Sequence, residues 1–216
     1  MGHKKKPDRE ASAMSKNLLA SVVAVGLLAG PMAASASPVQ WTVASGGNGH
    51  WYEFVAGAVN WSTAQGLAGS YFGGTGYLVN ITSAAENAFI LANMPTSWEG
   101  AWTGGREDIN TANLFYWDSG PEANQTVGPY TNWASGEPNN NPCCSGSGPA
   151  GEDRIQILGW SNNSSPGTWN DLAQAGTLWH MSGYIVESPV PLPAAAWLLL
   201  SGLTGFGFVA RRRTAA

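Results

Sequence analysis

The chain has 216 residues, of which 44% are hydrophobic and only 11% are charged. Its basic residues gather at the two ends, so residues 37–189 carry twelve acidic side chains against two basic ones, Arg106 and Arg154. This imbalance argues against a nucleic-acid partner, because phosphate binding needs positive charge. It favours a bound cation, since so many carboxylates repel one another unless water or a cation compensates them, and outside a cell that cation is calcium.

Residues 1–36 are predicted to form a secretory signal peptide. Five basic residues precede an apolar run at 18–30, and the small residues Ala34-Ser35-Ala36 follow it. The run is shorter than the about 20 residues that span a bilayer, so we expect cleavage after Ala36 and not a permanent anchor. The remaining residues 37–189 are long enough to form one domain with a core of its own.

The first half of this domain predicts two strands and two helices. A short β-forming run is followed by a capped helical segment that ends at Gly69, and a second strand is followed by a helix with an N-cap at Thr82-Ser83. The expected ranges are 51–55, 60–68, 77–81 and 82–92.

The second half has strand signals only. Short β-forming stretches at 115–117, 154–158 and 183–187 are separated by long loops rich in Gly, Asn, Pro and Ser. Helices early and strands late predict an α+β fold. The loop at 120–151 is far longer than an ordinary connection, and we interpret it as the functional loop. It contains both cysteines, Cys143 and Cys144, which as neighbours cannot join distant elements, so a vicinal disulfide, free thiols and intermolecularly paired thiols stay open as alternatives.

Five oxygen-bearing side chains in and after this loop predict a calcium site. Calcium takes about six to eight oxygen ligands, drawn from carboxylates, amide carbonyls and water. Three carboxylates and two amides are present within a short stretch of chain, although ordinary solvated loop acids would give the same spacing. The candidate ligands are Glu137, Asn139, Glu152, Asn170 and Asp171.

Residues 190–216 predict a membrane segment with a sorting function. A proline motif at 190–193 precedes an uncharged apolar run at 194–210 and the basic cluster at 211–213. The run is just long enough to span a bilayer, and the arginines would stay on the cytoplasmic side, which leaves the domain outside.

This tail resembles the PEP-CTERM sorting signal of Gram-negative, exopolysaccharide-making bacteria, although its proline motif lacks the usual Glu. The resemblance implies an exosortase-type processing enzyme as a partner. It also implies an exported protein that is first anchored in the membrane and then lies at the cell surface or in the extracellular matrix. An ordinary tail anchor is the alternative.

The order of motifs in the domain resembles the C-type lectin family over residues 51–187. Trp133 precedes Glu137-Pro138-Asn139, Glu152-Asp153 precedes an alternating strand, and Trp169-Asn170-Asp171 precedes a closing strand that ends at Glu187. The resemblance implies an α+β domain with two helices, two small antiparallel sheets and a long irregular loop that binds calcium and sugar. It also implies that Trp102, Trp117, Trp133 and Trp169 are core residues, whereas Trp160 and Trp179 are freer.

By the same resemblance, the five candidate ligands hold one calcium ion and the hydroxyls of a sugar. Carboxylates can accept a hydroxyl proton and amides can donate to a hydroxyl oxygen, and the Glu-Pro-Asn order implies a preference for mannose-type or glucose-type sugars. Pro138 is expected to be cis in the bound state, a form open to X-Pro bonds.

The chain also departs from the family. Positions of the usual disulfide cysteines hold Arg154, Gln174 and Val186, so those bridges are absent. An accessory calcium site is matched at Asp108 and Asp153 but not at Ala112 and Asn140, and we expect no second ion.

The leading expectation is therefore calcium-dependent binding of a glycan or exopolysaccharide at the bacterial surface, without enzymatic activity. A calcium-independent module that binds protein or has a structural role in a biofilm is the first alternative. A glycosidase is the second, because Glu137, Glu152 and Asp171 could form an acid–base pair, but these side chains serve better as ligands.

Overall fold

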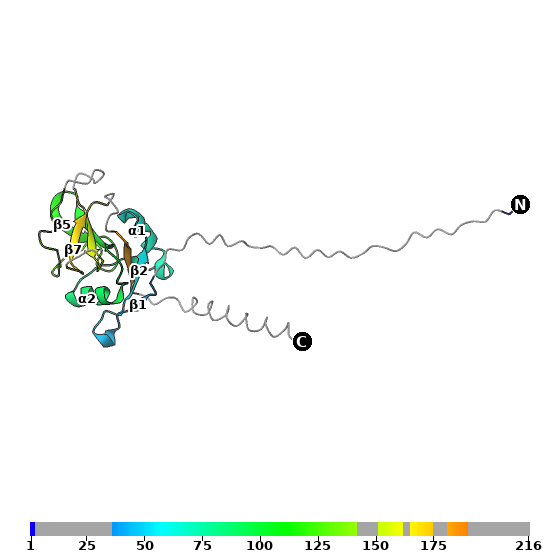
Figure 1. The fold of residues 1–216 in the computed structure, drawn as a ribbon, viewed down its shortest axis with the longest axis horizontal. Helices are drawn as coiled ribbons and strands as arrows, with labels where there is room; N and C mark the ends of the chain where they lie inside the picture. The colour runs from blue at the N-terminus through cyan, green and yellow to red at the C-terminus, as the bar shows by residue number, and fades with distance from the viewer. Residues whose placement is uncertain (3–35, 142–150, 162–164, 175–180, 190–216) are drawn as a thin grey trace. The chain divides into compact units, whose positions relative to one another are not determined.

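The computed structural model describes residues 1–2, 36–141, 151–161, 165–174 and 181–189 (Figure 1). Almost all of the expected signal peptide lies outside these residues. So do the cysteine pair, Trp179, the proline motif, the apolar run at 194–210 and the arginine cluster at 211–213. Within the described residues, no helix has the length and apolar character needed to cross a membrane.

The order of elements confirms the α+β class with two helices (Figure 1). The helices lie in the first half and the strands continue to the end of the domain, as the sequence predicts. The elements are β1 (Val39–Gln40), η1 (Val43–Ser45), β2 (Trp51–Ala56), α1 (Trp61–Ala68), η2 (Tyr71–Gly73), β3 (Tyr77–Leu78), α2 (Ala84–Asn93), β4 (Gly100–Asp108), β5 (Thr111–Trp117), β6 (Arg154–Leu158), β7 (Trp169–Leu172) and β8 (Gly183–Ser188).

Both helices begin at side-chain caps. The Asn60 side chain accepts a hydrogen bond from the Thr63 amide at 2.8 Å, and the Ser83 hydroxyl accepts one from the Glu86 amide at 3.1 Å. Each cap satisfies an amide that has no partner inside its helix. Helix α1 ends at Ala68, followed by Gly69 as expected, and α2 ends one residue beyond the predicted boundary.

The strands form two antiparallel groups that are joined into one network. The order is β1-β2-β8-β4-β6-β7, with β3 also paired to β8 and β5 to β4. All pairings are antiparallel except that of β4 with β8, where Ala101 pairs with Gly183 and Trp102 with Tyr184. The two small sheets expected from the sequence correspond to the β1-β2-β8-β3 and β5-β4-β6-β7 groups.

Strand β4 was not predicted, because three of its nine residues are glycines, which disfavour strands. Tertiary packing explains these residues. A Cβ on Gly104 would overlap the side chain of Asn80, and one on Gly105 would overlap Ile155. Close contact of β4 with its neighbours therefore requires glycine. In contrast, the predicted strand at 77–81 is shortened to Tyr77–Leu78.

Tryptophan packing fixes the start of β7. Trp169 is fully buried and makes edge-on contacts with three aromatic rings, those of Trp117, Tyr130 and Trp133. Its indole N–H donates to the Asn87 side chain on α2 at 2.9 Å. Trp102 and Trp117 are buried as expected, whereas Trp133 is only partly buried and Trp160 is 47% exposed. The residues that follow Trp169 are thus held in a fixed place.

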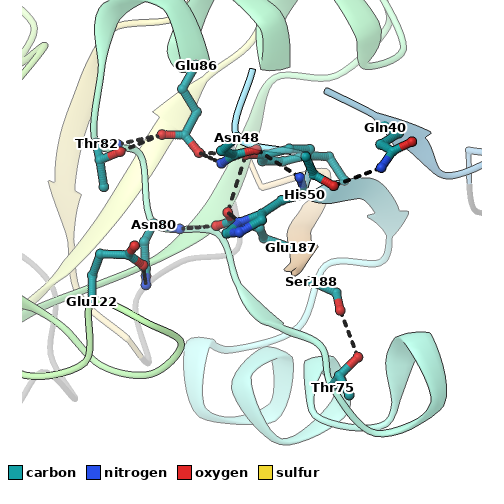
Figure 2. A network of polar contacts seen from close by, with 12 residues as sticks. Gln40, Asn48, His50, Thr75, Asn80, Thr82, Glu86, Glu122, Glu187 and Ser188 are labelled. Carbon is teal, nitrogen blue, oxygen red and sulfur yellow. Dashed lines mark hydrogen bonds and ion pairs between the residues drawn. The ribbon is translucent and has the colours of Figure 1, made fainter. Parts of the chain in front are cut away.

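A buried polar network connects α2 and β8 with the segment that leads into β2 (Figure 2). Glu86 and Glu187 are 1% and 2% exposed. The Tyr52 hydroxyl donates to Glu86 at 2.7 Å and lies 3.3 Å from Glu187, while the Nδ1 atom of His50 lies 2.6 Å from Glu187. The backbone amide of Asn80 also donates to Glu187, at 3.0 Å.

The protonation of this network follows from its burial. Burial raises the pKa of Glu187 to about 7, although the His50 contact opposes the shift. The Glu187 hydrogen bond raises the pKa of His50. Burial also raises the pKa of Glu86, against the donors from Thr82 and Tyr52. Neutral groups supply most of the hydrogen bonds to Glu86 and Glu187. Loss of one donor therefore leaves a buried carboxylate with too few hydrogen bonds.

We predict that Tyr52→Phe lowers the free energy of unfolding by about 1–3 kcal/mol, because Glu86 stays buried but loses a donor. Urea denaturation measures the difference. The matched control is Tyr116→Phe on β5, a half-exposed tyrosine outside the network, for which we expect a change within about 0.5 kcal/mol. Equal stability of Tyr52→Phe and the unaltered protein would contradict the role given to this hydroxyl.

Candidate functional site

Main-chain pairing brings the Glu-Pro-Asn segment to β7. Trp133 bridges to Trp169, the Trp169 amide donates to Asn132 at 2.8 Å, and the Ala134 amide donates to Trp169 at 2.8 Å. On the other side, β7 pairs with β6 so that Ile155 lies opposite Asp171. Asp171 therefore lies between the functional loop and the chain that enters β6 from Glu152.

Three consecutive backbone amides of the loop donate to two carboxylates. The amides of Asn139 and Asn140 donate to the two oxygens of Asp171, at 3.1 and 2.7 Å. The amide of Asn141 donates to Glu152 at 3.1 Å. Asp171 is fully buried and Glu152 is 6% exposed, so both depend on these donors.

Glu137 has one carboxylate oxygen without such compensation. Its Oε2 atom is buried and has no hydrogen-bond partner among the described residues. Burial, together with the nearby carboxyls of Asp171 and Glu152, raises the pKa of Glu137 to about 7, although the Asn139 backbone amide opposes the shift. The pKa of Glu152 is also raised, first by burial and then by Asp171, although the Asn141 amide opposes the shift. No basic side chain contributes to the pKa shift of either Glu137 or Glu152.

The two candidate amides lie beside the same aspartate. Asn139 is exposed and contacts Asp171 through its backbone, while the Asn170 side chain donates to the Asp171 carbonyl at 2.6 Å. The structure thus brings the five predicted ligand residues together around Asp171. The Glu137–Pro138 bond is cis, the form that the lectin resemblance implied for the bound state.

The donor set suits a hard cation such as calcium. Three carboxylates and two amide oxygens are the chemistry that calcium selects, and a buried carboxylate oxygen with no donor is a place where a cation would be stabilised. Among the described residues, however, no three His, Cys, Asp or Glu side chains are close enough to hold a metal by themselves. The amide oxygens would therefore have to contribute.

The two accessory candidates are satisfied by protein donors. Asp153 pairs with the Arg154 guanidinium at 2.9 Å and accepts from the Gln174 amide at 3.1 Å. Asp108 accepts from the Asn110 amide at 2.9 Å in the turn that follows β4. These contacts agree with the expectation that the two aspartates do not hold a second ion, but they do not test it.

Sequence analysis missed Glu107, which lies between the accessory candidates and the main site. It is 5% exposed, and its Oε2 atom has no partner among the described residues. Burial raises the pKa of Glu107, and the carboxylates of Asp171 and Asp153 add to this. No local pattern points to it, because β4 contains three glycines and its first six residues are all buried, without a regular alternation.

Two of the positions that lack the expected cysteines contact each other. The Arg154 guanidinium donates to the Gln174 side chain at 3.3 Å and lies 4.5 Å from the ring centroid of Trp61. A hydrogen bond and a cation–π contact thus connect β6, the end of β7 and helix α1 where a covalent bridge is absent.

Comparison with known proteins identifies the family. The model of the lectin C-type domain matches residues 58–173, more than half of the chain. The chain belongs to this family. Its α+β topology is the C-type-lectin-like fold, and members of the family are generally not enzymes.

The individual relatives have low sequence identity to this chain, and each match covers only part of the two sequences. Halomucin from Haloquadratum walsbyi is 31% identical over 121 residues, which are 47% of this chain and 1% of halomucin. The mouse low affinity immunoglobulin epsilon Fc receptor is 33% identical over 122 residues, 56% of this chain and 29% of the receptor. The chain thus spans less than a third of these relatives. The carbohydrate-recognition domain of cow CD23, solved in the presence of an oligosaccharide, is 30% identical with a TM-score of 0.45, over 64% of this chain and 86% of that domain.

We predict that, in buffer with a chelator, the domain loses stability as the pH rises from about 5 to 8. A carboxyl whose pKa is raised in the folded state contributes stability below its unfolded pKa, and this is lost as the pH passes the folded value, about 7 for Glu137. Urea midpoints at four pH values measure the slope. Glu137→Gln should reduce the slope and leave the part that Glu187 contributes, and an unchanged slope in that variant would show that Glu137 does not carry the effect.

Proposed function

We propose that the domain binds carbohydrate through one calcium ion held by Glu137, Asn139, Glu152, Asn170 and Asp171. The observation that carries this proposal is the buried oxygen of Glu137, which has no partner among the described residues and lies beside two further carboxylates. Burial and then neighbouring carboxyls raise these pKa values, and a divalent cation would stabilise the charged forms. Membership of the lectin C-type family supports the same ligand chemistry.

The ligand residues would differ in whether they accept hydrogen bonds from the sugar hydroxyls or donate to them. When bound, calcium would supply coordination for two neighbouring hydroxyl groups of a sugar. The carboxylates of Glu137 and Glu152 can accept a hydroxyl proton, and the amides of Asn139 and Asn170 can donate to a hydroxyl oxygen. The Glu-Pro-Asn order favours mannose-type or glucose-type sugars, in line with the family resemblance. Exposure of Asn139 keeps one donor open to solvent, where a glycan would arrive.

We further propose that the protein acts outside the cell. The basic, apolar and small-residue pattern of residues 1–36 supports export, and the proline motif, apolar run and arginines of residues 190–216 support membrane anchoring followed by exosortase processing. A Gram-negative cell surface or exopolysaccharide matrix would then present the glycan partner. C-type lectin relatives are typically extracellular or surface proteins, which agrees with this location.

A calcium-independent binding or structural module is the second candidate. One observation favours it: backbone amides already satisfy Asp171 and Glu152, so the loop has a folded form without an ion. The two candidates differ in whether calcium changes stability and ligand binding.

Calcium titration decides between them. Calcium binds only the folded state in this proposal, so about a 100-fold excess over its Kd should add about 2.7 kcal/mol to the free energy of unfolding. Isothermal titration and melting curves of the full chain, with calcium or with chelator, measure Kd and stability. Asp171→Asn should lose most of the calcium effect. A melting temperature that is indifferent to chelator would favour the calcium-independent module.

A polarity swap tests the sugar preference. Glu137→Gln combined with Asn139→Asp keeps the oxygen ligands and total charge but reverses which side donates. Calcium binding should survive, while preference should shift from mannose-type toward galactose-type sugars on glycan arrays. Each array is repeated with chelator as a control. Identical calcium-dependent profiles for both proteins would place sugar recognition elsewhere on the domain.

A further inference from the structure

One neutral residue connects the Asp171 carboxylate with the backbone of Glu152. The backbone amide of Asn140 donates to Asp171 at 2.7 Å, and its side-chain oxygen accepts from the Glu152 amide at 3.0 Å. Asp171 lies in β7 and Glu152 lies just before β6. Asn140 therefore fixes the loop to two separate elements.

The backbone at this point is shaped for that double contact. Asn140 has a φ of 47°, in the left-handed region that asparagine tolerates better than most residues. Gly151, with a φ of 76°, lies against it, and a Cβ on Gly151 would overlap the Asn140 side-chain oxygen. The absence of a side chain at Gly151 thus leaves room for the Asn140 to Glu152 hydrogen bond.

The oxygen of Asn140 is engaged by a protein donor, as are those of the neighbouring aspartates. Asp153 is held by Arg154 and the Gln174 amide. An amide side chain also adds no charge to a region where burial and carboxylates already raise the pKa values of Glu107, Glu137 and Glu152. These contacts indicate that Asn140 connects the loop to Asp171 and Glu152 and does not coordinate an ion. We call this pair of Asn140 hydrogen bonds the clamp.

We propose that Asn140 is a positioning residue that holds the loop against Glu152 and Asp171 before calcium arrives. This inference rests on the proposed calcium site, which it deepens. The clamp keeps Glu137 and Asn139, its near neighbours in the chain, beside the two carboxylates without help from a second ion. Binding of the first calcium ion then needs less ordering of the loop.

Asn140→Gly distinguishes the side-chain contact of Asn140 from its backbone contact. Glycine accepts the left-handed φ and keeps the amide that donates to Asp171, so only the acceptor for the Glu152 amide is lost. In the calcium-free full chain, hydrogen exchange of the Glu152 amide should become faster by about fivefold, and the Kd for calcium should rise by a similar factor. Asn124→Gly, at another left-handed asparagine outside the site, is the matched control and should change neither.

Gly151→Ala disturbs the same hydrogen bond, between Asn140 and the Glu152 amide, through a different residue. Its added methyl group meets the Asn140 oxygen in the unaltered protein but not in Asn140→Gly. The effects on calcium Kd should therefore be less than additive in the double variant. Additive effects would overturn the clamp.

The outcomes separate the two proposals. If the unaltered chain does not bind calcium, the proposed function fails, yet the exchange rate of the Glu152 amide still tests the clamp. Equal exchange rates in Asn140→Gly and the unaltered chain overturn it. If the unaltered chain binds calcium and Asn140→Gly binds it as tightly, the positioning role is overturned while the calcium site stands.

Discussion

Burial of carboxylates with almost no basic partners is the constraint on which this domain depends. Two arginines serve residues 37–189, and both are already paired, Arg106 with Asp118 and Arg154 with Asp153. The remaining buried acids must be stabilised by hydrogen bonds or by protonation, because an unpaired buried charge is costly. Different parts of the fold meet this demand in different ways.

Beside helix α2 the demand is met inside the protein. Tyr52, Thr82 and Asn80 provide donors to Glu86 and Glu187, and the Nδ1 atom of His50 contacts Glu187 (Figure 2). At the functional loop, three successive amides serve Asp171 and Glu152 but none serves the buried oxygen of Glu137. The carboxylates of Glu86 and Glu187 therefore have hydrogen-bond partners within the protein. The loop site, in contrast, retains a buried oxygen of Glu137 that a cation would stabilise. This difference is the physical reason for assigning binding to the loop.

Aromatic packing converts this chemistry into a defined site. Trp169 is fixed by three rings and by Asn87, and the Asn87 amide also donates to the Gly167 carbonyl at 3.0 Å. Helix α2 thereby anchors the chain immediately before Asn170 and Asp171. The long loop pairs with the same strand start, so its residues reach Asp171 although they are far away in sequence. A rigid scaffold under a loop of this length limits the entropy lost when a ligand binds.

The sequence by itself determined the features that depend on local signals. The caps at Asn60 and Ser83 satisfy amides within one helical turn, and the β-forming residues of 154–158 favour a strand, so both could be predicted. The five candidate ligand residues could be named because calcium requires a recognisable set of oxygens. Only the tertiary structure decided the rest. The glycines of β4, the buried Glu107, the Glu86–Glu187 network and the Asn140 clamp arise from contacts between residues far apart in the chain. Close packing and burial, which no local pattern encodes, give these residues their roles.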